Sequence, residues 1–194
     1  MAITYPLALP THTGIASVEF RAVNTVAYSQ SPFTLSGQAH AYSGQMWQAD
    51  ISLPPMKRAD AEQWIAFLIS LRGQFGTFLL NDPSATTPRG TASSVTVTGS
   101  AGDASVTAVL TGTLLAGDYF QLGTTSDATL HKVLVDRSGN GTMEIWPALR
   151  KARSSISGDV TSAAGVFRLM SNEQAWNVSE ASIYGLNFAA MEAL

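Results

Sequence analysis

The stretch WQADISLPPMKRADAEQWIAFLISLRG, residues 47–73, decides the fold. Its first part, residues 47–53, alternates strictly between apolar and polar side chains, which is typical of a β-strand with one buried face. Two prolines end this strand, and a helix is predicted over about residues 58–72 because apolar side chains recur there at helical spacing: Trp64, Phe67, Leu68 and Leu71. An apolar stripe of this kind has to be buried, so the stretch predicts a sheet with one covering helix.

Two further stretches share this alternation. Residues 17–23 and residues 184–190 each place apolar side chains on one face. An unpaired terminal strand this apolar would promote aggregation, so we expect residues 184–190 to join the same sheet. The polar segment between residues 29 and 44 contains turn-forming residues and predicts a hairpin around Phe33 to Ser43.

The composition changes after Pro83. Residues 84–165 are rich in Thr, Ser, Gly, Ala and Val, and short runs separated by turn signals predict strands at 94–98, 105–110, 118–122, 130–135 and 142–146. The sequence therefore predicts a mainly β fold with one helix. A β-sandwich domain of residues 1–87 and 165–194 is interrupted by an inserted small all-β domain, barrel-like in form, of residues 88–164.

The surface is expected to be neutral. Charged residues make up 13% of the chain, against about 25% in typical globular domains. A surface of Ser, Thr, Gly, Gln and Asn loses little solvation free energy on burial, which favours contact with other protein subunits over a solitary neutral β protein. The net charge of −3 gives no footprint for nucleic-acid binding, and no stretch predicts membrane insertion.

The ends and the cysteine content add little. The N-terminal residues lack the basic and apolar regions of a signal peptide. The sequence contains no Cys, which excludes disulfides and thiol chemistry and fits assembly in a reducing cytoplasm.

No catalytic residue, metal ligand or cofactor site is predicted. His12, His40 and His131 are not at metal-ligand spacing, and each is interpreted as a surface or partly buried polar residue. The motifs of serine hydrolases and nucleotide-binding loops do not occur. Carboxylates beside Gly, Pro, Ser or Asn are interpreted as turn caps: Asp82, Asp118, Asp127, Asp136 and Asp159. A cell-wall hydrolase is the remaining enzymatic alternative, since paired carboxylates can meet only in space.

Two other features have ordinary interpretations. The basic cluster of residues 149–153 is interpreted as a solvated loop after a strand that ends at Trp146. Trp47 and Trp64 lie on predicted core faces and are interpreted as core residues.

Several stretches, taken in order, resemble tail proteins of siphophages. These are residues 47–56 with 58–64 and 67–68, residues 71–83, the insert segments 117–122, 130–133, 145–150 and 165–169, and the closing 184–188 with 192–194. The ordered set resembles distal tail or minor tail proteins of long-tailed bacteriophages. The resemblance implies a virion structural protein at the tail tip, assembled in the bacterial cytoplasm. It also implies a ring, commonly a hexamer, that joins the tail tube to tape measure, tip hub and receptor-binding proteins. The first domain would be related to the tail-tube fold.

Candidate contact residues follow from these expectations. A ring needs interfaces between different surfaces of neighbouring copies, and sheet edges and hairpins can supply them. We expect the oligomer interface to include Phe33, Leu35, Tyr42, Gln48 and Asp50. The alternative function is a carbohydrate-binding module, in which Tyr119 and Trp146 of the inserted domain contact a host-surface glycan.

Overall fold

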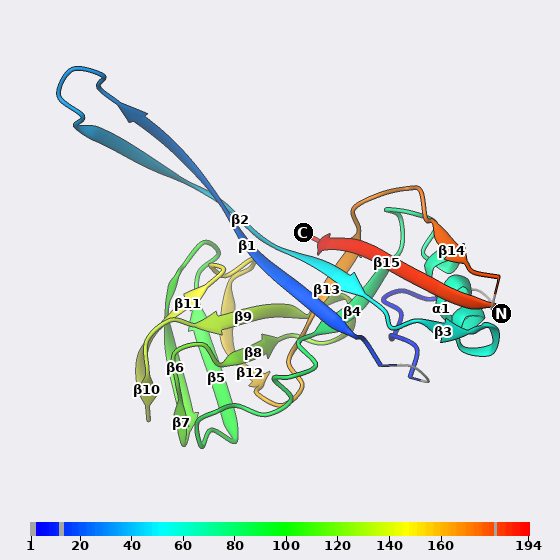
Figure 1. Cartoon of the computed structure of the whole chain (residues 1–194). Coiled ribbons are helices and arrows are strands. Elements are labelled where there is room, and N and C mark those ends of the chain that lie inside the picture. The colour runs from blue at the N-terminus through cyan, green and yellow to red at the C-terminus, as the bar shows by residue number, and fades with distance from the viewer. Residues whose placement is uncertain (1–2, 12–13, 181) are drawn as a thin grey trace.

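The computed structural model describes residues 3–11, 14–180 and 182–194. The described residues form two β units, an α-helix and a long β-hairpin, and Figure 1 shows the hairpin projecting from the two units. The fold is mainly β with one helix in the described part of the chain: a β-sandwich domain and an inserted small barrel, as the sequence predicts.

The main sheet has the strand order β1-β2-β15-β13-β4, and its neighbouring strands are antiparallel. The short strands β3 and β14 also pair with β15. The elements of this unit are β1 (Ser17–Gln30), β2 (Gly37–Ser52), β3 (Met56–Lys57), α1 (Arg58–Ser70), β4 (Thr77–Asn81), β13 (Ala164–Leu169), β14 (Trp176–Val178) and β15 (Ile183–Glu192). The predicted terminal strand therefore lies inside the sheet, between β2 and β13.

The core of this unit is filled by β2 and α1. One face of β2 is buried, as the alternation predicts: Trp47, Ala49 and Ile51. On α1, the ring of Trp64 lies 6.2 Å from that of Phe188, and the ring of Phe67 lies 5.6 Å from that of Phe78. Trp47 and Trp64 are thus both core residues, as expected.

α1 ends two residues earlier than predicted. Its last residue is Ser70, and Leu71 caps it. Arg72 and Gly73 have φ angles of 52° and 67°. These left-handed conformations cannot continue a right-handed helix, and glycine adopts them without a steric penalty.

The inserted unit is a closed barrel with the strand order β11-β6-β5-β12-β8-β9. Its elements are β5 (Ser94–Gly99), β6 (Ser105–Thr111), β7 (Thr113–Leu114), β8 (Tyr119–Leu122), the short 3-10 helix η1 (Thr125–Asp127), β9 (Thr129–Val133), β10 (Arg137–Ser138), β11 (Gly141–Trp146) and β12 (Arg153–Asp159). The strand β12 is not predicted by the sequence. All these elements lie between β4 and β13 along the chain.

The helix α1 has 13 residues. In the described ranges, no helix combines the length and the hydrophobicity that crossing a bilayer requires.

Candidate functional site

The most prominent surface feature is the outer part of the β1–β2 hairpin. The two strands pair from Ser17↔Ser52 to Gln30↔Gly37, with a register shift between Asn24 and Val26. Beyond that shift the hairpin leaves both β units and projects away from them (Figure 1). Residues 24–45 are called the arm below.

The arm is much longer than the predicted hairpin of residues 33–43. Its turn is closed by two backbone hydrogen bonds, in which Ser31 N–H donates to Ser36 O at 2.9 Å and Leu35 N–H donates to Ser31 O at 3.0 Å. Phe33 and Leu35 therefore lie in the turn at the tip, and Tyr42 lies on β2. A hairpin is present as predicted, but its strands extend well beyond residues 33–43. The extra length was not predicted because these strands have no buried face that would produce a sequence pattern.

The arm carries no charged side chain. No Asp, Glu, Lys or Arg occurs between Arg21 and Asp50. Large apolar and aromatic side chains of the arm are nevertheless solvent-exposed: Val26 53%, Tyr28 64%, Phe33 94%, Leu35 70% and Tyr42 56%. Exposed apolar groups on a neutral ribbon are typical of a surface that another protein covers. Val26 and Tyr28 were not among the predicted contact residues. The absence of charged residues between Arg21 and Asp50 could have indicated them.

Both long edges of the arm are free within the part of the chain that the structure describes. β1 is the outermost strand of the main sheet. β2 pairs with β15 only at residues 48–52, below the arm. An isolated two-stranded ribbon is marginally stable in water, and its free N–H and C=O groups can pair with another strand.

The inserted barrel holds the base of the arm on both strands. The indole N–H of Trp146 donates to Asn24 Oδ1 at 2.8 Å. The backbone N–H of Ala148 donates to Gln45 Oε1 at 2.9 Å. Asn24 and Gln45 face each other in the hairpin, directly beside the register shift. These two hydrogen bonds to the barrel thus help to fix the direction in which the arm projects from the two β units.

The other predicted interface residues, Gln48 and Asp50, are not on the arm. Both lie on the part of β2 that pairs with β15. Asp50 forms an ion pair with Arg21 of β1, in which Asp50 Oδ2 lies 2.5 Å from Arg21 Nη2. They are half-buried on the face of the sheet opposite Trp47, so the structure does not bring them together with Phe33, Leu35 and Tyr42.

Tyr119 and Trp146 lie together in a groove of about 370 Å³ beside the arm base, which also includes Phe20, Trp47 and Lys132. The ring of Trp146 stands edge-on to Trp47 with centroids 4.4 Å apart. The ammonium group of Lys132 lies 4.3 Å from the centroid of the Tyr119 ring. Both predicted aromatics are therefore half-buried junction residues rather than a flat exposed platform.

The basic cluster of residues 149–153 is not a solvated loop, and that interpretation is wrong. Arg150 donates two hydrogen bonds to the buried carboxylate of Glu192, at 3.1 and 2.6 Å. Arg153 is buried and donates to Asp127 at 2.6 Å. Arg150 thus joins the inserted unit to β15 of the main sheet, whereas Arg153 forms its ion pair within the inserted unit.

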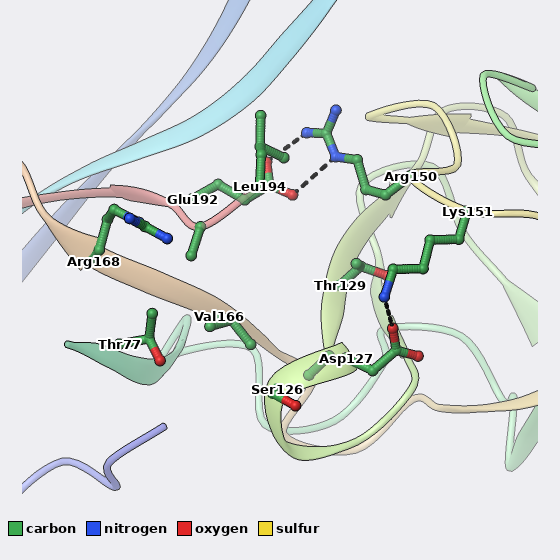
Figure 2. A pocket seen from close by; sticks show the side chains of 12 residues that line it. Thr77, Ser126, Asp127, Thr129, Arg150, Lys151, Val166, Arg168, Glu192 and Leu194 are labelled. Atoms are coloured by element: carbon green, nitrogen blue, oxygen red, sulfur yellow. Dashed lines mark hydrogen bonds and ion pairs between the residues drawn. The ribbon is translucent and has the colours of Figure 1, made fainter. Parts of the chain in front are cut away.

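Figure 2 shows the cavity beside this junction, of about 510 Å³, lined by Asp127, Lys151, Arg150, Glu192 and other residues. Hydrogen bonds from Lys151 and Arg153 lower the pKa of Asp127, so this carboxylate stays ionised. A general acid needs a raised pKa. Both carboxylates of the cavity are held by cations: Glu192 of the main sheet by Arg150 of the inserted unit, and Asp127 by Lys151 and Arg153 within the inserted unit. The pair of Arg150 and Glu192 therefore joins the two units.

His131 also differs from its predicted environment. It was expected at or near the surface, but its exposure is 0%. Its Nδ1 lies 2.8 Å from Pro147 O and its ring stacks on Phe120 at 5.4 Å. Burial lowers its pKa to about 4, which keeps the imidazole neutral. His40 lies exposed on the arm against Tyr42. His12 lies outside the described residues.

Most of the predicted turn caps bind backbone N–H groups. Asp82 accepts from Ser84 N, Asp159 from Thr161 N and Asp136 from Ala116 N. The buried Asp118 accepts from three N–H groups where the chain enters the barrel: Arg89, Gly90 and Leu115. Across residues 3–11, 14–180 and 182–194, no three His, Asp or Glu side chains gather in a group that could hold a metal ion.

No family model matches the chain, and no curated protein matches it either. A functional assignment therefore rests on the arm and on the hydrogen bonds that hold its base against the barrel.

Proposed function

We propose that the chain is a non-enzymatic structural protein of the tail tip of a long-tailed bacteriophage. Copies of the chain form a closed ring, a hexamer, which joins the tail tube and tape measure to the tip hub and receptor-binding proteins. The ring is assembled in the bacterial cytoplasm and becomes part of the virion. The phage setting comes from the sequence resemblance given above.

The observation that carries the proposal is the uncharged, projecting arm with its exposed apolar side chains. Fully burying a Leu or Phe side chain stabilises a complex by about 1.5–3 kcal/mol. Phe33 and Leu35 are 94% and 70% exposed, so most of this free energy is still to be gained on assembly. No charged group on the arm has to be desolvated, so little of this gain is lost again.

A ring also needs rigid subunits. The bidentate pair of Arg150 and Glu192 and the hydrogen bonds of Trp146 and Ala148 fix the barrel and the arm base on the main sheet. An arm whose base is already held in place loses less conformational entropy on binding than a freely moving arm would.

The test is the mass of the particle in solution. We expect the wild-type protein to have the mass of a closed ring by light scattering, and the double variant Leu35→Glu, Tyr42→Glu to have the mass of a monomer. The control is Val109→Glu, because Val109 is 52% exposed on the barrel, away from the arm. If the double variant keeps the wild-type mass, the arm is not the interface.

A second candidate function is glycan binding, favoured by the position of Tyr119 and Trp146 in one groove. Binding on a glycan array that Trp146→Phe retains and Trp146→Ala loses would support stacking of a sugar on this ring. A wild-type protein that binds no glycan on the array contradicts this candidate.

A further inference from the structure

A closed ring of identical subunits imposes a second requirement on each copy. In a head-to-tail interface, the arm of one copy meets a different surface on the next copy. This acceptor surface has to match the arm: an open strand edge, exposed apolar side chains and little charge. The inference below rests on the proposed ring and names the acceptor.

The strand β14 has these properties. In the described ranges it pairs with β15 on one side only. Trp176 is 42% exposed and Val178 53%, and Ile183 at the start of β15 is 43% exposed. Glu180 is the one charged residue between Glu173 and Glu192.

Among the described residues, most other neutral or apolar surfaces lack an open edge, and the two-residue strands β7 and β10, which pair with each other alone, lie beside the charged Asp136 and Arg137. The barrel strands β5 and β6 are nearly uncharged and expose Val109, but each is paired on both sides. The outer edge of β4 is covered by the chain near Leu7, whose N–H donates to Thr77 O at 2.9 Å and whose carbonyl accepts from Leu79 N at 3.0 Å. The free edge of β1 belongs to the arm from Asn24 onward, and its inner part carries the charged Glu19 and Arg21. Pairing β1 with β1 would give a two-fold dimer.

The placement of the two surfaces also fits a ring. In Figure 1 the arm projects at one end of the molecule, while β14 lies with α1 and β3 at the opposite end. Head-to-tail contacts that close into a ring require the two complementary surfaces to lie on different sides of the subunit.

We infer that the edge strand β14 of one copy is the docking site for the arm of the next copy. The arm adds to the β14–β15 sheet by strand pairing, and its apolar side chains pack on Trp176, Val178 and Ile183. Main-chain hydrogen bonds contribute affinity in such an arrangement, and the alternate side chains contribute specificity.

A mixing experiment with two surface variants tests this assignment. Leu35→Glu damages the arm and leaves β14 intact, whereas Val178→Glu damages β14 and leaves the arm intact. We expect each variant alone to have the mass of a monomer. An equimolar mixture should form a dimer and nothing larger, because a Val178→Glu arm can dock on a Leu35→Glu subunit, after which both remaining surfaces are damaged. Val109→Glu should assemble like the wild type, and circular dichroism should show the same fold in all three variants.

The other outcomes separate the two proposals. If Val178→Glu still forms rings of wild-type size, β14 is not the acceptor, and the proposed ring is unaffected. A mixture that remains monomeric also overturns the assignment, because the two residues then do not belong to complementary halves of one interface. If the wild-type protein is itself monomeric, the ring and its acceptor fail together.

Discussion

The ion pair between Arg150 and Glu192 makes a quantitative prediction about how the barrel is held on the main sheet. The side chain of Glu192 is 5% exposed and that of Arg150 is 17% exposed. The carboxylate accepts two hydrogen bonds from the guanidinium group and a third from the backbone N–H of Trp47 at 3.0 Å. In the variant Arg150→Met, the carboxylate of Glu192 would lose both hydrogen bonds from the guanidinium group and keep the one from Trp47 N–H. The carboxylate would still lie in a poorly solvated site.

Removing one partner of a buried ion pair costs about 3–5 kcal/mol. We expect the lower end, about 3 kcal/mol, because a cavity beside the pair admits water. With a urea dependence of about 2 kcal/mol per molar, the midpoint of urea unfolding should fall by about 1.5 M.

The control is Arg58→Met, which breaks the exposed pair of Arg58 and Glu62, with side-chain exposures of 77% and 51%. Exposed helical pairs of this spacing contribute about 0.3–0.5 kcal/mol. The double variant Arg150→Met, Glu192→Gln should recover part of the lost stability, because no charge is then left buried. Equal midpoints for Arg150→Met and Arg58→Met would refute the reasoning from burial.

Three further predictions concern the buried histidine, the arm base and two glycines. The free energy of unfolding should fall as the pH is lowered from 6.5 to about 4, because the pKa of His131 is depressed and the unfolded chain binds the proton first; urea titrations should show a shallower fall for His131→Gln. Asn24→Ala with Gln45→Ala removes two hydrogen bonds of about 1 kcal/mol each at the arm base; rings of this variant should dissociate at higher protein concentration on dilution, with little change in secondary structure by circular dichroism. Gly112→Ala should lower the melting temperature more than Gly139→Ala, because both positions have positive φ but only the former would press a Cβ against neighbouring backbone.

The main sheet was predictable because its side chains alternate between buried and exposed environments, and α1 was predictable because its buried side chains recur at helical spacing. In residues 47–53 and 184–190 the period of two directly reflects burial on one face. β12 was missed because it has no such pattern: Ile156 is its one large apolar residue and is 36% exposed. Its buried member is Arg153, which is satisfied by Asp127, a residue distant in the sequence.

The environment of His131 could not be predicted for a related reason. β9 lies at the junction, so both of its faces are covered. Leu130 packs in the core of the main unit, while His131 stacks on Phe120 of the barrel core. A strand buried on both faces gives no alternation, and a polar residue within it looks like a surface residue.

Part of the candidate site was predictable from the sequence. The polar, weakly charged segment between two strands indicated a hairpin with Phe33, Leu35 and Tyr42 as contact residues, and all three are exposed on the arm. The length of the arm was not predicted, because a free ribbon has no buried face to produce a period. The contribution of Gln48 and Asp50 to an interface stays a prediction.

The most direct test is the subunit number of the purified wild-type protein, obtained from electron micrographs of single particles together with the particle mass. We expect closed rings of uniform size, with six copies of the chain and one mass over a wide range of protein concentration. Isolated monomers at every concentration, with the arm free in solvent, would contradict the proposal that this arm is an assembly surface.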